Sequence, residues 1–258
     1  MRFALFLLPF TLSAQLPPGN EIGVAMGHLH LNAKDPASSQ RFWLDYMGGQ
    51  VVKLGKLDVY KFPDVLVMVR QADVSGGSEG TAVNHLGFLV KDLDAELKRC
   101  TEAVSCRVQR VLTDTRQAFV LNADDVKVEL VEDTKMSERV RHHHVHFFNQ
   151  QIMDSRAWYA KMFAAKPGKR GKFWAADLPG VNLSWADSPE AVVPTKGRAI
   201  DHIGFEVKNL EAFVKTLASQ GVKFDVPYRK VPQLGIAVAF FTDPWGAYVE
   251  LTEGLNKL

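Results

Sequence analysis

Two histidines and one glutamate recur at nearly the same spacing in both halves of this 258-residue chain. The residues are His28, His85 and Glu129 in the first half and His144, His202 and Glu250 in the second. The two histidines are 57 residues apart in the first set and 58 in the second, and the glutamate follows after 44 and 48 residues. Two imidazoles and one carboxylate can bind a divalent metal and leave coordination positions open for substrate or oxygen.

Two further histidines, His30 and His146, stand two residues after the first histidine of each set. On a strand they would share its face, about 7 Å further along. We take them as candidate catalytic acid–base or supporting groups, with ordinary packing as the alternative. On the same alternation His142 shares this face and His143 points away, so the histidines of 142–146 do not form one four-ligand site.

Each of the four histidine-bearing segments alternates between apolar and polar residues, as a strand does, and opens a unit of similar order. The expected order is a strand, a helix and further strands. The expected elements are 23–32, 36–47, 50–54, 57–62 and 65–71; 84–91, 93–101, 107–113, 116–122 and 126–132; 142–149, 154–165, 170–177 and 182–187; and 200–208, 210–220, 222–226, 228–232, 237–242 and 247–252. Repetition on this scale determines architecture before any single motif does.

The chain resembles the vicinal-oxygen-chelate superfamily, which includes glyoxalases, bleomycin-resistance proteins, fosfomycin-resistance enzymes and extradiol dioxygenases. The resemblance rests on four modules in order, on the His-x-Gly-Phe segments at His85 and His202, and on Asp-Pro-Trp-Gly followed by Glu250-Leu. It implies an α+β fold in which four βαβββ modules pair into two open β-barrels, each around a metal. We expect residues 1–20 to be a leader, residues 21–135 the first pair of modules and residues 136–258 the second.

The resemblance places metal ligands on the first strand of each paired module and on the last strand of the second. The six residues of the two recurring sets stand at those positions. We favour the second set because its turn at Asp243 is intact, whereas the corresponding turn of the first set, 122–125, is one residue shorter. The alternative is that shared ancestry kept these residues after function was lost.

The first residues predict an export signal. A positive start at Arg2 precedes an apolar run over 3–12 and a small-residue cleavage point near Ala14. The run is too short for a comfortable membrane span, and retention as an anchor is the alternative. We therefore expect a secreted or periplasmic protein with no membrane association after cleavage. In such a compartment Cys100 and Cys106 could form a disulfide, or they could be two buried thiols.

The composition excludes some partners. The chain has 31 Lys and Arg against 29 Asp and Glu, a formal net charge of +2, which is too balanced to predict nucleic-acid binding. We expect a small-molecule substrate and a monomer or homodimer.

Three classes of function compete within the family. An extradiol-type dioxygenase would use Fe(II) or Mn(II), but Phe240 and Phe241 stand where the family usually has a tyrosine, and 231–239 contains no acid–base histidine. A glyoxalase-like lyase or isomerase would use Zn or Ni with a second glutamate on 65–71 or 182–187, where only Asp187 offers a carboxylate. A bleomycin-resistance-like binding module lacks metal ligands altogether.

A fosfomycin-type transferase shares the ligands, but it is normally cytosolic with one pair of modules per chain. We predict an exported metal-dependent enzyme that binds its substrate through two vicinal oxygens. We favour a dioxygenase over a lyase or isomerase, and either over a binding module.

Overall fold

The computed structural model describes residues 16–258, so the predicted cleavage point near Ala14 lies outside the described residues. Four modules follow one another, each with one main helical segment and four strands, and short 3-10 turns are added at Thr113–Thr115 and Leu255–Lys257. The first comprises β1 (Val24–Ala33), α1 (Pro36–Gln40) continued by a π-helical turn (Arg41–Tyr46), β2 (Gln50–Leu54), β3 (Leu57–Phe62) and β4 (Val65–Gln71). The second comprises β5 (Val83–Val90), α2 (Leu93–Glu102), β6 (Arg107–Leu112), β7 (Gln117–Leu121) and β8 (Lys127–Glu132).

The second half repeats this order. The third module comprises β9 (Val140–Asn149), α3 (Ile152–Phe163), β10 (Lys166–Arg170), β11 (Phe173–Leu178) and β12 (Val181–Asp187). The fourth comprises β13 (Ile200–Val207), α4 (Leu210–Ser219), β14 (Phe224–Val231), β15 (Ile236–Thr242) and β16 (Tyr248–Glu253). Two local predictions were wrong: the single strand expected over 170–177 is a hairpin of β10 and β11, and the two strands expected over 222–232 are one strand, β14.

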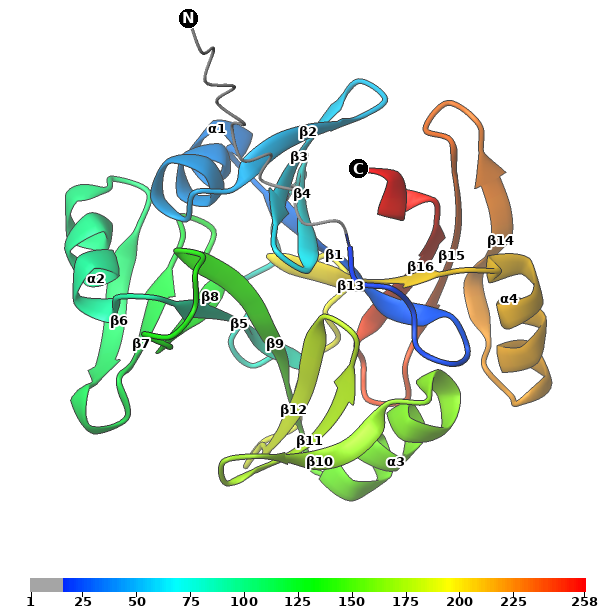
Figure 1. Cartoon of the computed structure of the whole chain (residues 1–258). Coiled ribbons are helices and arrows are strands. Elements are labelled where there is room, and N and C mark those ends of the chain that lie inside the picture. Colours follow the sequence, from blue (N-terminus) through cyan, green and yellow to red (C-terminus); the bar gives the residue numbers. More distant parts are fainter. Residues whose placement is uncertain (1–15) are drawn as a thin grey trace, which may run out of the picture.

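The modules pair into two open eight-stranded sheets, which confirms the expected fold class (Figure 1). One sheet has the order β14-β15-β16-β13-β1-β4-β3-β2, and the other β10-β11-β12-β9-β5-β8-β7-β6. The first module therefore shares a sheet with the fourth, and the second with the third. The expected pairing of consecutive modules, within 21–135 and within 136–258, was wrong.

The linkers give a physical reason for this pairing. Consecutive elements tend to be neighbours, more so when the connection between them is short. The link between the second and third modules, 133–139, is the shortest of the three, against 72–82 and 188–199. It joins the two modules that share a sheet, and the first and fourth modules complete the other.

The central contact of each sheet is an antiparallel pair of first strands, β1 with β13 and β5 with β9. Side chains alternate between the two faces of these strands. On β1, Leu29 and Leu31 are fully buried in the main apolar core, while the histidines between and beside them face the other way. The helical segments pack on this core through aromatic residues such as Trp43 and Tyr159, which are also fully buried.

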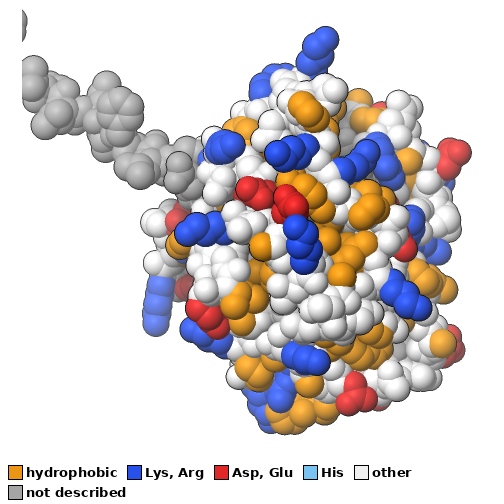
Figure 2. Space-filling view, turned by 90° about the vertical axis from the view of Figure 1, so that its right-hand side faces the viewer, with side chains coloured by type: hydrophobic (Ala, Val, Ile, Leu, Met, Phe, Trp, Pro, Cys, Tyr) orange, Lys and Arg blue, Asp and Glu red, His pale blue; other side chains and the backbone are white. Residues whose placement is uncertain are grey.

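The distribution of charged side chains on the surface agrees with the balanced numbers of acidic and basic residues in the sequence. On the face drawn in Figure 2, basic and acidic side chains are interspersed with apolar ones. Among the described residues, no helix combines the length and the apolar character that crossing a bilayer requires.

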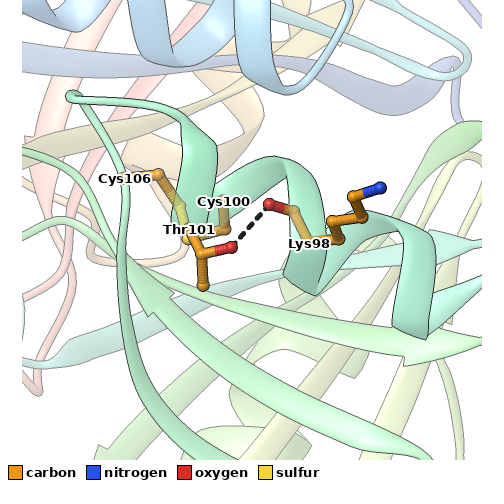
Figure 3. The surroundings of a disulfide bond; sticks show 4 residues. All are labelled: Lys98, Cys100, Thr101 and Cys106. Carbon is orange, nitrogen blue, oxygen red and sulfur yellow. Dashed lines mark hydrogen bonds between the residues drawn. A yellow bond between two sulfur atoms is a disulfide. The ribbon is translucent and has the colours of Figure 1, made fainter.

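Cys100, near the end of α2, forms a disulfide with Cys106, just before β6, with the two Cα atoms 5.1 Å apart (Figure 3). Of the two alternatives for these cysteines, the structure therefore has the disulfide.

Replacing both cysteines by alanine should lower the free energy of unfolding by about 2 kcal/mol, because a short cross-linked loop restricts the unfolded chain modestly. The measurement is urea denaturation of the double variant beside the wild-type protein. Wild-type protein treated with a reductant should lose a similar amount of stability. An unchanged midpoint in both would show that this disulfide contributes no stability.

Candidate functional site

Each sheet brings three histidines and one glutamate together at its central strands. Within each group one donor atom per residue lies within 4.8 Å of all the others. The first site comprises His28, His30, His202 and Glu250, and the second site comprises His85, His144, His146 and Glu129. All are buried except His30, which is half-buried.

The six expected ligands and the two expected catalytic histidines all lie in these two groups, but the expected grouping was wrong. We expected His28 to join His85 and Glu129, and His144 to join His202 and Glu250. The structure instead exchanges the first histidines, because each sheet is built from one module of each half. The similar sequence spacings within the two recurring sets therefore reflected the repetition of the modules, and they did not predict which residues are in contact.

The strand register places the two groups identically. In the first site His28 lies opposite Gly204, His30 lies opposite His202, and Gly204 stands beside Glu250 on the neighbouring parallel strand. In the second site the corresponding residues pair in the same register. They are His144 opposite Gly87, His146 opposite His85, and Gly87 beside Glu129.

The glycine of the His-x-Gly-Phe segments has a specific role. A Cβ atom added at Gly204 would overlap the imidazole ring of His28, and one added at Gly87 would overlap the ring of His144. Each ring therefore lies directly on the backbone of the partner module's first strand. Only glycine allows this close approach.

Both groups converge on one carboxylate oxygen. In the first site Glu250 Oε2 lies 2.9 Å from His28 Nε2 and 2.8 Å from His202 Nε2. In the second site Glu129 Oε2 lies 2.8 Å from His144 Nε2 and 3.1 Å from His85 Nε2. His146 Nδ1 lies 3.0 Å from His85 Nε2.

Burial keeps most of these imidazoles uncharged. It is the main cause that lowers the pKa of His30, His85, His144 and His146. Burial opposes ionisation of Glu129 as well, but the bonded histidines hold its pKa well below the usual range. The second site thus presents neutral imidazoles and an ionised carboxylate, the protonation states that bind metals.

The first site differs at His202. Burial lowers the pKa of this group, but Asp201 and Glu250 outweigh burial and raise it overall. Glu250 itself has a lowered pKa despite burial, because His28 and His202 lie beside it.

The residues fit a divalent cation. Within the described part of the chain, His146 Nε2 and both ring nitrogens of His30 are buried without a hydrogen-bond partner. A buried polar atom without a partner is costly unless something binds it. Three imidazoles and a carboxylate suit Fe(II), Mn(II), Zn(II) or Ni(II). Either group could hold such an ion, with His30 or His146 as the fourth ligand.

The position for a second carboxylate carries no acid in either site. Glu250 stands beside Gly204, and the equivalent neighbours in the repeat are Met68 beside His30 and Ser184 beside His146. Asp187, the carboxylate left open by the sequence, pairs with Asn149 at the far end of β12 and is exposed. Neither group therefore contains the second glutamate of a glyoxalase.

The surroundings of the two sites differ. The second site opens on a cavity of about 870 Å³, whose lining includes His85, His146, Phe119, Phe173 and Arg170. Around the first site an apolar cluster occupies the same face of the sheet. Its buried members are Leu16, Leu54, Val59, Leu66, Ile236, Val238 and Leu255. Leu66 lies beside His28, and the C-terminal turn that carries Leu255 lies between the β2–β4 and β14–β16 strands (Figure 1).

Sequence reasoning missed two residues of the second site. His143 was expected to point away, but a bulge beside Gly87 shifts the register. His143 Nδ1 lies 3.0 Å from His144 Nδ1, and the residue lines the cavity. Burial, together with nearby Arg170, lowers the pKa of His143 to about 4.

Arg170 was missed because β10 was not recognised as a strand. Arg170 lies opposite Phe173 at the end of its hairpin, as Leu54 lies opposite Leu57 in the first module. The available signal was that Arg170 stands where the first module has Leu54. This difference can be seen only once the two hairpins are aligned correctly.

Comparisons with known proteins agree with the fold. The family model described as Glyoxalase/Bleomycin resistance protein/Dioxygenase superfamily matches residues 25–251. Glyoxalase I from Zea mays has a TM-score of 0.71 at 17% identity, over 91% of this chain and 94% of that chain. A "putative dioxygenase" from Bacillus subtilis has a TM-score of 0.63 at 14% identity, over 93% of this chain and 86% of that chain. The comparison with curated proteins gave no match.

Replacing Gly204 by alanine should displace His28 and abolish metal binding at the first site alone, and Gly87→Ala should do the same at the second. The physical reason is the overlap between the added Cβ and the imidazole ring. The measurement is metal content per chain after reconstitution, which we expect to fall from two ions to one in either variant. Gly168→Ala is the matched control, because a Cβ there meets nothing within 4 Å. Full metal content in both site variants would refute this account of the glycines.

Proposed function

This chain belongs to the glyoxalase/bleomycin resistance protein/dioxygenase superfamily, and from that premise we propose that it is a metal-dependent enzyme whose chemistry takes place at the second site. The observation that carries the proposal is a group of three imidazoles and one carboxylate that opens on a cavity large enough for a small molecule. Four protein ligands leave positions for a substrate that chelates through two adjacent oxygens.

The residues around the cavity support this assignment. His85, His144, His146 and Glu129 would hold the ion, which supplies Lewis-acid or redox chemistry when bound. Phe119, 5.3 Å from His85, and Phe173, 4.7 Å from His146, would restrict water around the substrate.

A dioxygenase is favoured over a lyase or isomerase because the position expected for a second carboxylate holds no acidic residue. Isomerisation of a carbonyl compound requires a base that moves a proton between carbon atoms. Ser184 occupies the position where a carboxylate could do so. Oxygen chemistry on Fe(II) or Mn(II) requires no such base, so a serine at this position is compatible with a dioxygenase.

One observation keeps the lyase or isomerase as the second candidate. His143 faces the cavity and is a neutral imidazole at pH 7, because burial lowers its pKa to about 4. With His144 bound to an ion through Nε2, its Nδ1–H donates to His143 Nδ1, so His143 presents Nε2–H and can donate to a substrate oxygen, in a dioxygenase or in an isomerase with Zn(II) or Ni(II).

We assign no turnover to the first site. The same donor set is present, but apolar side chains crowd it. Phe240, whose ring centroid is 5.4 Å from that of His202, packs against the cluster that includes Leu66 and Leu255. We propose that a metal ion at this site stabilises the pairing of the first and fourth modules.

Export is part of the proposal. The apolar run and cleavage point within the first 14 residues support it, as does the disulfide between Cys100 and Cys106. Disulfides persist in oxidising compartments and are rare in the cytosol of most organisms.

Metal analysis of anaerobically purified protein tests the proposed enzyme. We expect two ions per chain in the wild type and one in His85→Ala and His202→Ala, because each variant removes a ligand of a different site. We expect stoichiometric Fe or Mn, and oxygen uptake with a panel of catechols and 2-oxo acids that only His85→Ala loses.

The two variants are matched controls for each other. Zn or Ni without oxygen uptake would favour the lyase or isomerase. Loss of turnover in His202→Ala alone would place the chemistry at the first site. A wild-type protein that binds no metal after reconstitution would overturn the proposal.

A further inference from the structure

The cavity of the second site carries an excess of positive charge. Its lining includes four basic side chains, Arg110, Lys127, Arg170 and Lys172, and two acidic ones, Asp114 and Glu129. Lys127 is neutralised by Glu79, 2.7 Å away outside the lining. Glu129 is directed to the histidines. The charged side chains that remain are Arg110, Arg170, Lys172 and Asp114, and their net positive charge favours an anionic ligand.

Arg170 is the basic residue that the fold holds in place. Its side chain is 15% exposed, and its Nε donates a 2.8 Å hydrogen bond to Ser184 Oγ. Ser184 in turn donates a 2.6 Å bond to Asn182 Oδ1. The guanidinium is thereby directed at the site, with Nη2 3.3 Å from His146 Nδ1.

The position of Arg170 is not explained by Glu129. Arg170 Nη2 lies 3.7 Å from Glu129 Oε2, beyond hydrogen-bond distance, whereas His144 and His85 lie 2.8 Å and 3.1 Å from the same oxygen. A cation so close to the ligand group also repels a divalent ion. Glu129 offsets the charge of the arginine only in part, so a further anion between the arginine and the ion would favour metal binding.

The first site serves as an internal comparison. It has the same donor set in the same register, but Leu54 and Met68 occupy the positions of Arg170 and Ser184. The same arrangement of donor atoms is thus built without an arginine at this position. The Arg170–Ser184 pair is found only where the ligand group meets a cavity.

The apolar part of the lining suggests the shape of the ligand. Phe119, Phe148 and Phe173 are half-buried and face the cavity. The rings of Phe148 and Phe173 lie 5.3 Å and 4.7 Å from that of His146. Aromatic side chains around a cavity favour a flat, unsaturated molecule.

We propose that the second site binds a flat organic carboxylate, which chelates through two vicinal oxygens while Arg170 binds its carboxylate group. The inference rests on the proposed metal-dependent function and names the substrate class of that site. A guanidinium presents two parallel N–H donors that match a carboxylate. Ser184 is a positioning residue that holds the guanidinium in this orientation.

Binding of matched probes to the Zn(II)-loaded protein tests the proposal without turnover. The probes are protocatechuate and its amide, which share the vicinal hydroxyls and differ in the charge of one group. Calorimetry should show that wild-type protein binds protocatechuate about 10- to 100-fold more tightly than the amide, as expected for a charge-assisted pair. Arg170→Gln should abolish this preference and leave the affinity for the amide within a few-fold.

Two controls separate this role from a structural one. Lys169→Gln removes an equal charge from the neighbouring position, which lines a different cavity, and should keep the preference. Zn(II) affinity of Arg170→Gln in the absence of probe should equal or exceed that of the wild type, because a repelling cation is removed. Loss of metal from this variant would overturn the proposal and give Arg170 a structural role.

Two further outcomes separate failure of the proposed metal-dependent function from failure of the proposed carboxylate binding by Arg170. Failure of both probes to bind the Zn(II)-loaded wild type would refute the open chelating site itself. Equal binding of both probes, unchanged in Arg170→Gln, would refute the carboxylate assignment and leave the metal-dependent function standing.

Discussion

The contact between an imidazole ring and a glycine on the opposite strand determines the arrangement of both sites. His28 lies on Gly204 and His144 on Gly87, so each histidine meets its glutamate across the strand of another module. This contact requires antiparallel pairing of first strands in one register. Because strand register can shift only by whole residues, a slip of one position would turn the histidines to the other face. The ligand group and the pairing of modules therefore depend on each other.

The same register occurs in both sheets, yet the two sites differ in what surrounds them. An apolar cluster with Leu54 and Met68 packs around the first, and a cavity with Arg170 and Ser184 adjoins the second. Packing density leaves no room for a substrate where apolar side chains interdigitate. A repeat of this kind allows one copy to contribute stability while the other carries chemistry, with no change in the ligands themselves.

Electrostatics distinguishes the second site further. The half-buried Arg170 lies beside the histidine–glutamate group and lowers its affinity for a cation, because its charge is only partly offset by Glu129, 3.7 Å away. Three features occur together at the second site: the guanidinium held by Ser184, the open face of the imidazoles, and the phenylalanines around them. Each has an ordinary explanation alone, and together they support the proposed recognition of an anionic chelator.

The sequence by itself determined the α+β class, the four modules and the residues that form the two histidine–glutamate groups. Strand alternation and the recurrence of His85 at His202 carry that information locally, and the glycine two residues later belongs to the same segment. The strands of 166–178 were less predictable, because Pro167 and Gly168 are typical of a turn and lie here within β10.

Only the tertiary structure decided which residues meet. The first strands of all four modules have similar patterns, so any two could pair, and the short link at 133–139 and the packing of the cores select the partners. A bulge beside Gly87 then turns His143 toward the cavity. The position of Arg170 beside His146 depends on the register of three strands. Contacts between residues far apart in the chain are fixed by packing and register, for which a local sequence pattern contains no unique solution.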